Sequence, residues 1–165
     1  MGPRPLEFLR RLGPWAPALS WAILISYAST DAFSASHTSV IILPVLHWLF
    51  PYASAETLER AHFFIRKTAH FSEYFVFSLF LMRGMRGNEH GWKLRWAIWA
   101  LVIAAVYSAL DEYHQAFVPS RTASAWDSLL DTTGAATAQF VLWLWIWFHA
   151  RHLIRGRDEK VTGDL

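Results

Sequence analysis

Residues 96–110 form a nearly continuous apolar run, and this run restricts what the whole chain can fold into. Its length and composition are typical of a helix that crosses a lipid bilayer. The composition of the chain agrees, because 54% of the residues are hydrophobic and 10 are tryptophan. We therefore predict a small, all-α integral membrane protein with one domain.

Three further apolar segments complete a predicted four-helix transmembrane bundle. Residues 15–29 could be the core of a cleaved signal peptide, but we interpret them as an uncleaved first span. Residues 69–82 are the apolar part of a second span, and residues 126–148 form the fourth. We expect the second helix to begin after an N-cap at Ser54 and to end near Arg86.

Residues 31–52, which follow the first span, are predicted to lie on the membrane surface. Their apolar core is short and contains Pro44, so we expect one or two interfacial helices there. The predicted organisation is a basic N-terminal segment at 1–14, a four-span membrane domain at 15–150 and a polar tail at 151–165. We expect that tail to be disordered.

The distribution of basic residues predicts how the bundle is oriented. Among the 15 Lys and Arg residues, only four lie outside the N-terminus, the loop after the second span and the C-terminal tail. These four are Arg60, Arg66, Lys67 and Arg121. The positive-inside rule then places both termini in the cytoplasm. Because the basic residues flank the apolar segments, we predict no nucleic-acid partner.

Three predicted helices carry polar stripes near the same, outer face of the membrane. At about 100° of rotation per residue, each stripe occupies one side of its helix. The stripes are Lys67, His70, Glu73 and Tyr74 on the second helix; Ser108, Asp111, Glu112 and Gln115 on the third; and Asp127, Asp131, Gly134 and Ala138 on the fourth. We expect them to face one another around a small, water-accessible cavity.

Gly134 and Ala138 also form a pair of small residues that lets another helix approach closely. Such an approach would bring Asp131 against its neighbours. An ionised carboxylate below the interface costs about 2.5–3.5 kcal/mol on insertion scales. We therefore expect Asp131 to find a partner such as Lys67, His70 or Arg121.

His70 and Asp111 are the candidate catalytic residues, because an imidazole and a carboxylate are predicted to share the cavity. Arg121, in a turn after Pro119, suits bidentate recognition of phosphate or carboxylate. A salt bridge from Arg121 to Asp127 that only fixes the loop is the alternative. The candidate ligand-binding residues are Lys67, Glu73, Tyr74, Glu112, Gln115, Arg121, Asp127 and Asp131.

Several ligand-binding candidates also have a simpler interpretation. Lys67 could be a snorkelling anchor, and Tyr74 an interfacial aromatic residue. Glu73 could pair with Arg66 or Lys67, and Asp127 could complement a helix dipole. A metal ion would have to use histidine and carboxylates, since the chain has no cysteine. The spacing matches no strong ligand motif, so we predict neither a metal nor a cofactor.

The chain resembles the VanZ-like family of small bacterial four-span membrane proteins. The resemblance rests on Lys67-x-x-His70-Phe71-x-Glu73-Tyr74, then Asp111-Glu112-x-x-Gln115-x-Phe117-x-Pro119-x-Arg121-x-x-Ser124-x-x-Asp127, then Gly134. It covers most of the chain and implies a location in the bacterial cytoplasmic membrane. Two residues depart from the family pattern: Ser120 stands where glycine is usual, and Asp131 where asparagine is usual. The founding member is linked to teicoplanin resistance, but the resemblance supplies no reaction.

We predict a cell-envelope protein whose outer-leaflet pocket binds or modifies an anionic component, either a membrane lipid or an envelope precursor. Arg121 and Lys67 would hold the anion, and His70 and Asp111 would position or move a proton. The alternative is a membrane scaffold whose charge cluster is structural. Proton or ion translocation is a third hypothesis. The inner halves of the spans are apolar, which argues against it. Whether a reaction is catalysed stays open, because such clusters occur in binding sites as readily as in catalytic ones.

Overall fold

The structure is a computed structural model that describes residues 12–89 and 91–163. These residues form five α-helices and two short 3-10 helices, with no strand in the described ranges. The order is η1 (Gly13–Trp15), α2 (Ala16–Ala28), η2 (Asp31–Phe33), α3 (Ala35–Leu49), α4 (Ala55–Arg86), α5 (Leu94–Gln115) and α6 (Ala125–Gly163). The expected all-α class is confirmed. The basic N-terminal segment lies, up to residue 11, outside the described residues.

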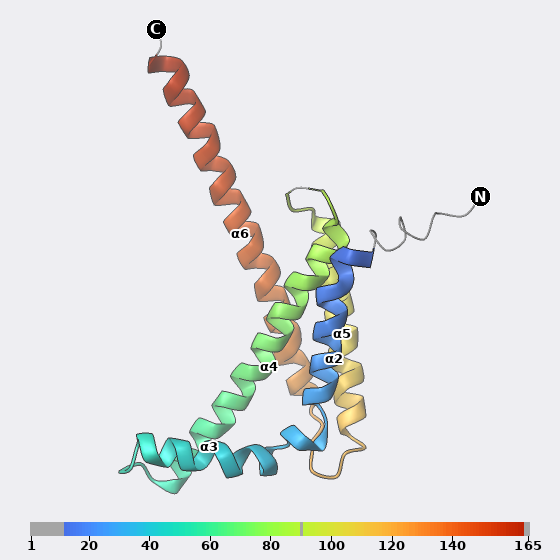
Figure 1. The fold of residues 1–165 in the computed structure, drawn as a ribbon, viewed down its shortest axis with the longest axis vertical. Helices are drawn as coiled ribbons and strands as arrows, with labels where there is room; N and C mark the ends of the chain where they lie inside the picture. Colours follow the sequence, from blue (N-terminus) through green and yellow to red (C-terminus); the bar gives the residue numbers. More distant parts are fainter. Residues whose placement is uncertain (1–11, 90, 164–165) are drawn as a thin grey trace, which may run out of the picture.

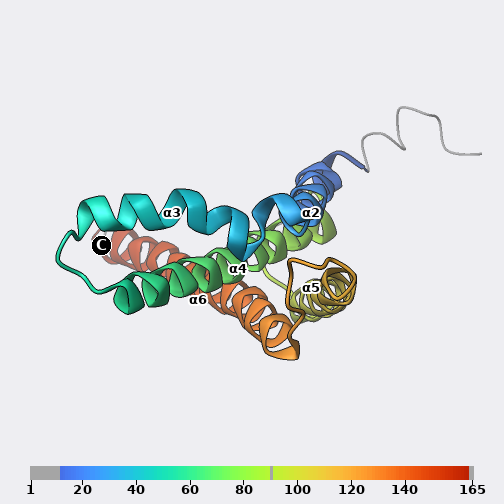
Figure 2. The same ribbon diagram turned by 90° about the horizontal axis from the view of Figure 1, so that it is seen from below.

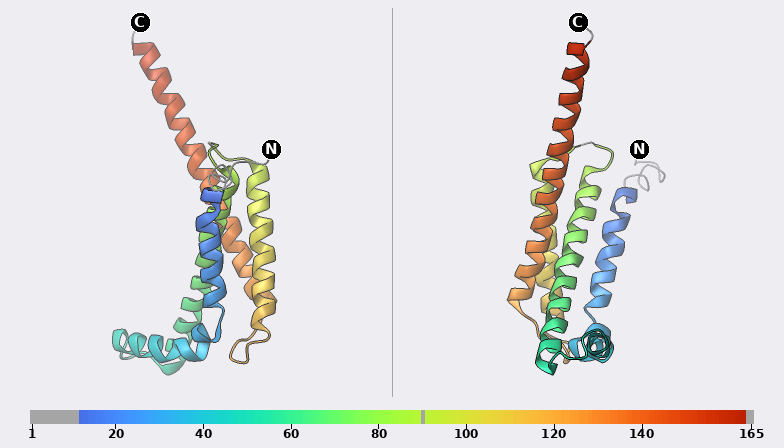
Figure 3. Two further views of the ribbon diagram at one scale, coloured as in Figure 1. Left: turned by 45° about the vertical axis from the view of Figure 1, so that its right-hand side comes forward. Right: turned by 90° about the vertical axis from the view of Figure 1, so that its left-hand side faces the viewer.

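Four helices run lengthwise and α3 crosses them at one end (Figure 1). The right-hand view of Figure 3 shows this most directly, because α3 is seen nearly end-on there while α2, α4 and α6 stand upright. Viewed from below, α3 extends beside the first turns of α4 (Figure 2). The turn after α2, the start of α4 and the loop at residues 116–124 therefore lie at this end, which we call the α3 end.

The capping of α4 explains its bounds. The Ser54 side chain accepts a hydrogen bond from the Thr57 backbone N–H at 3.2 Å, and Glu56 lies in the first turn, where a carboxylate complements the helix dipole. The helix ends at Arg86 and is followed by Gly87, whose φ of 53° is easily adopted by glycine. The expected start and end of this helix are confirmed. Its 32 residues span about 48 Å.

Small residues let the central helices pack closely. Ala100 and Ala104 of α5 and Ala135 of α6 are fully buried beside the α4 aromatic ring of Tyr74. At Gly134, an added Cβ would lie only 3.1 Å from the carbonyl carbon of Phe71 on α4. The predicted close approach at Gly134 is therefore confirmed, with α4 as the neighbouring helix.

The outward faces of the bundle carry large apolar side chains. Ile23 on α2, Trp99 and Leu110 on α5 and Phe140 on α6 are all exposed. Polar side chains lie inside instead: Gln139 of α6 donates to the Ser78 hydroxyl of α4 at 2.8 Å. Apolar surface this extensive marks a membrane or partner surface rather than a face turned to water.

By length and apolar composition, two described segments could cross a membrane: Asp31–Leu49 and Leu94–Gln115. The second is α5, the expected third span. The first contains α3, which we had expected at the interface. The other expected spans do not meet this test. The helix α2 has only 13 residues, α4 carries charged side chains along its length, and threonines and Gln139 interrupt the apolar segment of α6. Length and composition alone thus do not establish four spans.

The helix α6 continues well past the apolar segment and ends at Gly163. The tail that we expected to be disordered is therefore helical up to that residue. Residues 149–163 contain no proline and several good helix formers, so nothing in the sequence stops the helix after the apolar segment.

Candidate functional site

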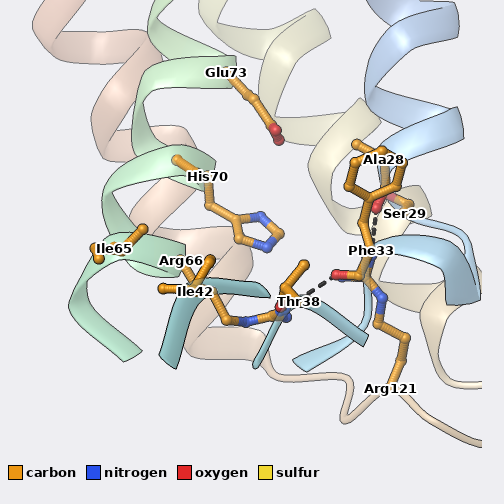
Figure 4. A pocket seen from close by; sticks show the side chains of 11 residues that line it. Ala28, Ser29, Phe33, Thr38, Ile42, Ile65, Arg66, His70, Glu73 and Arg121 are labelled. Atoms are coloured by element: carbon orange, nitrogen blue, oxygen red, sulfur yellow. Dashed lines mark hydrogen bonds between the residues drawn. The ribbon is translucent and has the colours of Figure 1, made fainter. Parts of the chain in front are cut away.

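A cavity of about 140 Å³ opens at the α3 end, between α2, α3, α4 and the 116–124 loop. Arg66, His70 and Glu73 reach it from α4, and Arg121 reaches it from the loop (Figure 4). A neighbouring cavity of about 160 Å³ shares Arg66, His70 and Arg121 and adds Lys67 and Asp127. We call these two spaces together the polar pocket. Six of the predicted site residues therefore line it: Lys67, His70, Glu73, Gln115, Arg121 and Asp127.

Lys67 and Asp127 form an ion pair that joins α4 to α6. Both side chains are largely shielded from solvent, with 28% and 17% of their surfaces exposed. The alternative in which Asp127 pairs with Arg121 is wrong. Because Asp127 neutralises the Lys67 ammonium group, this lysine contributes less positive charge to the polar pocket than the sequence suggested.

Arg121 binds backbone carbonyl groups at the end of α2. Its Nη2 donates to the carbonyl oxygens of Ala28 and of Thr30, the latter at 3.0 Å. The last carbonyls of a helix lack partners within it, so the guanidinium group caps α2. Burial lowers the pKa of Arg121, while the nearby carboxylates of Asp111 and Glu73 raise it. The buried Nε has no hydrogen-bond partner among the described residues.

Arg66 belongs to the pocket although it was considered only as a possible partner of Glu73. Its Nη1 donates to the Phe33 carbonyl oxygen at 3.0 Å and to the Thr38 hydroxyl at 3.1 Å. These contacts hold its guanidinium group at the junction of η2 and α3. The one signal for this role in the sequence is its position beside Lys67, in the helix that supplies His70.

His70 and Asp131 face each other across the α4–α6 contact. The distance from His70 Nδ1 to Asp131 Oδ1 is 3.7 Å, and the Asp131 side chain is completely buried. Ser108 of α5 donates to the other carboxylate oxygen, Oδ2, at 2.8 Å. Neither His70 Nδ1 nor Asp131 Oδ1 has a hydrogen-bond partner in the described part of the chain. Of the three partners expected for Asp131, the structure therefore places His70 beside it.

Asp111 does not line the polar pocket, although both of its hydrogen-bond donors do. Its Oδ2 accepts hydrogen bonds from the Ser29 hydroxyl at 2.7 Å and from Gln115 Nε2 at 3.0 Å. It lines a separate cavity of about 280 Å³ with Tyr107 and His114. No hydrogen bond or ion pair connects it to His70 in the described residues. Ser29 was not among the predicted site residues, and its only signal in the sequence is that it is a polar residue ending an apolar run.

Glu112 and Tyr74 do not line the polar pocket, whereas Gln115 and Glu73 do. Glu112 accepts the Ser124 backbone N–H at 2.7 Å, which fixes the turn before α6. Gln115 donates to Asp111 and is buried. Tyr74 is fully buried, and its hydroxyl has no hydrogen-bond partner among the described residues. Glu73 is half-buried and points into the polar pocket (Figure 4).

The polar pocket combines guanidinium, imidazole and carboxylate groups, which suits the binding of an anion and the holding of a proton. Within the described residues, no three histidine, aspartate or glutamate side chains are arranged to hold a metal ion. Buried polar atoms without partners among the described residues lie on His70 and Arg121, which line the polar pocket, and on Asp131, which faces His70. Such atoms are uncommon in folded proteins.

An all-helical bundle with an apolar exterior and a charged cluster at one end defines a small helical membrane protein. The VanZ/LLP1 family matches residues 15–148, and the chain belongs to this family. The resemblance seen in the sequence is thereby confirmed. No curated protein and no solved structure matches the chain.

Proposed function

We propose that the protein spans the bacterial cytoplasmic membrane four times, through α2, α4, α5 and α6, with both termini in the cytoplasm. The crossing direction of α3 favours a position along the outer membrane surface (Figure 3). The apolar outward faces of the lengthwise helices fit contact with lipid. Arg83, Arg86, Lys93 and Arg95 lie at the end opposite α3, as the positive-inside rule requires of a cytoplasmic loop.

We further propose that the polar pocket binds the anionic headgroup of a membrane lipid or an envelope precursor. The observation that carries this proposal is that two guanidinium groups, Arg66 and Arg121, line the same small cavity as His70. Apolar side chains of Phe33, Ile42 and Ile65 lie beside them and could receive the start of a lipid chain. Guanidinium groups suit phosphate and carboxylate, so the ligand class is an amphipathic anion.

His70 gives the pocket a group that can hold or release a proton next to the bound anion. Asp131, 3.7 Å away, would balance the charge of the imidazole ring when that ring is protonated. This arrangement suffices for pH-sensitive binding and is also the minimum for acid–base chemistry. A part in envelope homeostasis, or in glycopeptide resistance of the kind to which the founding member is linked, belongs to the same proposal.

Titration of the purified protein with dihexanoyl phosphatidylglycerol in a neutral detergent tests the headgroup site. We expect Arg66→Gln to weaken binding by about tenfold or more, as for the loss of a charge-assisted hydrogen bond. Arg60→Gln is the matched control, because Arg60 lies on the same helix, is exposed and pairs only with Glu56. Equal affinity of the Arg66→Gln variant and the wild type would refute the site.

Arg121→Ala should also abolish binding, but this side chain holds the end of α2. Its thermal unfolding must therefore be measured beside the titration. Binding of a zwitterionic short-chain phosphatidylcholine with the same affinity would show that the pocket does not recognise negative charge.

A structural role for the cluster is the second candidate, and one observation favours it. The polar groups of Lys67, Arg121 and Asp111 are already engaged within the chain, with Asp127, with α2 carbonyls and with Ser29. If the cluster is structural, the Asp111→Asn and His70→Gln variants should lose thermal stability, and their loss of function should be proportional to that loss. A headgroup site would lose binding in His70→Gln with little change in unfolding temperature.

A further inference from the structure

A second cavity lies toward the opposite end of the bundle, between α5 and α6. These helices diverge toward that end (Figure 3). The cavity has a volume of about 270 Å³, near the lower end of the range of roughly 300–1,000 Å³ for ligand pockets. Its walls are mainly apolar, and none of them belongs to the polar pocket. They include Leu94, Ile98, Leu101, Phe140 and Trp143.

One wall residue, Gln139, presents an unused hydrogen-bond acceptor. Its side chain is only 6% exposed, and its Nε2 donates to the Ser78 carbonyl oxygen at 3.1 Å and to the Ser78 hydroxyl at 2.8 Å. A carbonyl oxygen can only accept, so this contact fixes which end of the amide faces Ser78. The other end, Oε1, is left buried without a partner among the described residues.

Trp92, at the start of the same cavity, presents an unused donor. Its indole Nε1 is buried and has no hydrogen-bond partner in the part of the chain that the structure describes. Buried polar atoms are hydrogen-bonded in the great majority of cases, and hydrocarbon chains cannot form hydrogen bonds with them. Two residues that line the cavity thus carry an unpaired donor and an unpaired acceptor, and the other walls are apolar. A hydroxyl group can satisfy both, because it accepts and donates.

We propose that this cavity binds an acylglycerol lipid with a free hydroxyl group. The hydroxyl would accept from Trp92 Nε1 and donate to Gln139 Oε1, and an acyl chain would lie along Ile98, Leu101 and Phe140. No cationic side chain is among the described residues that line the cavity, so a phosphorylated headgroup finds no charged partner there. The proposal rests on the membrane placement given above, but it is independent of headgroup binding in the polar pocket.

Photolabelling of the full chain in phosphatidylcholine nanodiscs tests this site. The probe is a diacylglycerol with a diazirine in one acyl chain, and mass spectrometry maps the labelled residues. We expect labelling of residues 94–101 and 136–143, which unlabelled dioleoylglycerol removes by competition. Its 3-O-methyl ether accepts a hydrogen bond but cannot donate one, so it should compete about tenfold more weakly.

Trp92→Phe is the sharpest variant, because it removes the N–H donor and keeps an aromatic ring. It should lower labelling by about tenfold, the change that corresponds to roughly 1.4 kcal/mol. Trp99→Phe is the control, since Trp99 lies on α5 but is exposed and does not line the cavity. Gln139→Leu should have the same effect as Trp92→Phe, with its unfolding temperature recorded because Gln139 also holds Ser78.

Equal competition by the methyl ether, labelling spread evenly over the lipid-facing surface, or unchanged labelling of the Trp92→Phe variant would each overturn the proposal. Arg66→Gln separates it from the headgroup site. That variant should lose phosphatidylglycerol binding and keep diacylglycerol labelling, so failure of one site leaves the other standing.

Discussion

The hydroxyl group of Ser29, the residue after α2, donates a hydrogen bond to Oδ2 of Asp111 on α5 at 2.7 Å. Both residues are buried, and Gln115 donates to the same oxygen at 3.0 Å. This contact fixes the end of α2 against α5. It also positions the α2 carbonyl group of Ala28 to which Arg121 donates, so one buried carboxylate helps to order one wall of the polar pocket.

Replacing Ser29 with alanine should destabilise the protein by about 1.5–3 kcal/mol, because a buried carboxylate loses a donor. Thermal unfolding of the purified protein in detergent measures this change. In the Asp111→Asn background the same substitution should cost clearly less, since the two side chains act as a pair. Ser72→Ala, at an exposed position on α4, is the control. Equal costs of Ser29→Ala in both backgrounds would show that the pair is not coupled.

Asp131→Asn should raise the unfolding temperature, with a gain of about 1–2 kcal/mol. Asparagine can still accept from Ser108 and can also donate to His70 Nδ1, which now has no partner. It further removes a buried charge. Asp127→Asn should do the opposite, because Lys67 would lose its ion pair. A drop in unfolding temperature for both variants would contradict this account of Asp131.

Gly134→Ala should destabilise the bundle by about 1–3 kcal/mol, the usual cost of overpacking. The added methyl group would run into the Phe71 backbone, which cannot turn aside as a side chain could. Gly13→Ala is the matched control, because no atom lies within 4 Å of an added Cβ there. Thermal unfolding in detergent distinguishes the two. A Gly134→Ala variant as stable as wild type would show that α4 and α6 lie further apart.

Cysteine labelling tests the proposed topology, and the chain has no native cysteine to interfere. Ala116→Cys lies in the loop at the α3 end and Asn88→Cys in the loop at the other end, both exposed. We expect a membrane-impermeant maleimide to label intact cells only at position 116 and to label position 88 only after lysis. The reverse pattern would place the polar pocket on the cytoplasmic side.

The helical periodicity of the sequence was sufficient to predict much of the site. Lys67, His70 and Glu73 were expected on one face of a helix, and all three line the polar pocket. Helical spacing determines which side chains share a face, whatever the neighbouring helices do. The N-cap at Ser54 was equally visible, because capping depends on residues only three positions apart.

The partners of these side chains could not be predicted in the same way. Asp111 was assigned to the cavity with His70, yet it does not line that cavity and instead accepts a hydrogen bond from Ser29, 82 positions earlier in the chain. Arg121 was expected to meet an anion or Asp127; Asp127 pairs with Lys67, and Arg121 caps α2. Such pairings depend on how far each helix is turned and tilted against the next, and a one-dimensional pattern does not encode those angles.

The sequence by itself determined an apolar, helical chain with ionisable stripes on three helices, because local spacing and hydrophobicity fix those properties. Only the tertiary structure decided that Asp131 would face His70, that Lys67 would be neutralised by Asp127 and that Arg66 would enter the pocket. It also placed Trp92 and Gln139 around an apolar cavity, from residues 47 positions apart. Contacts between helices arise from packing, where Gly134 and the buried alanines set how closely the backbones approach.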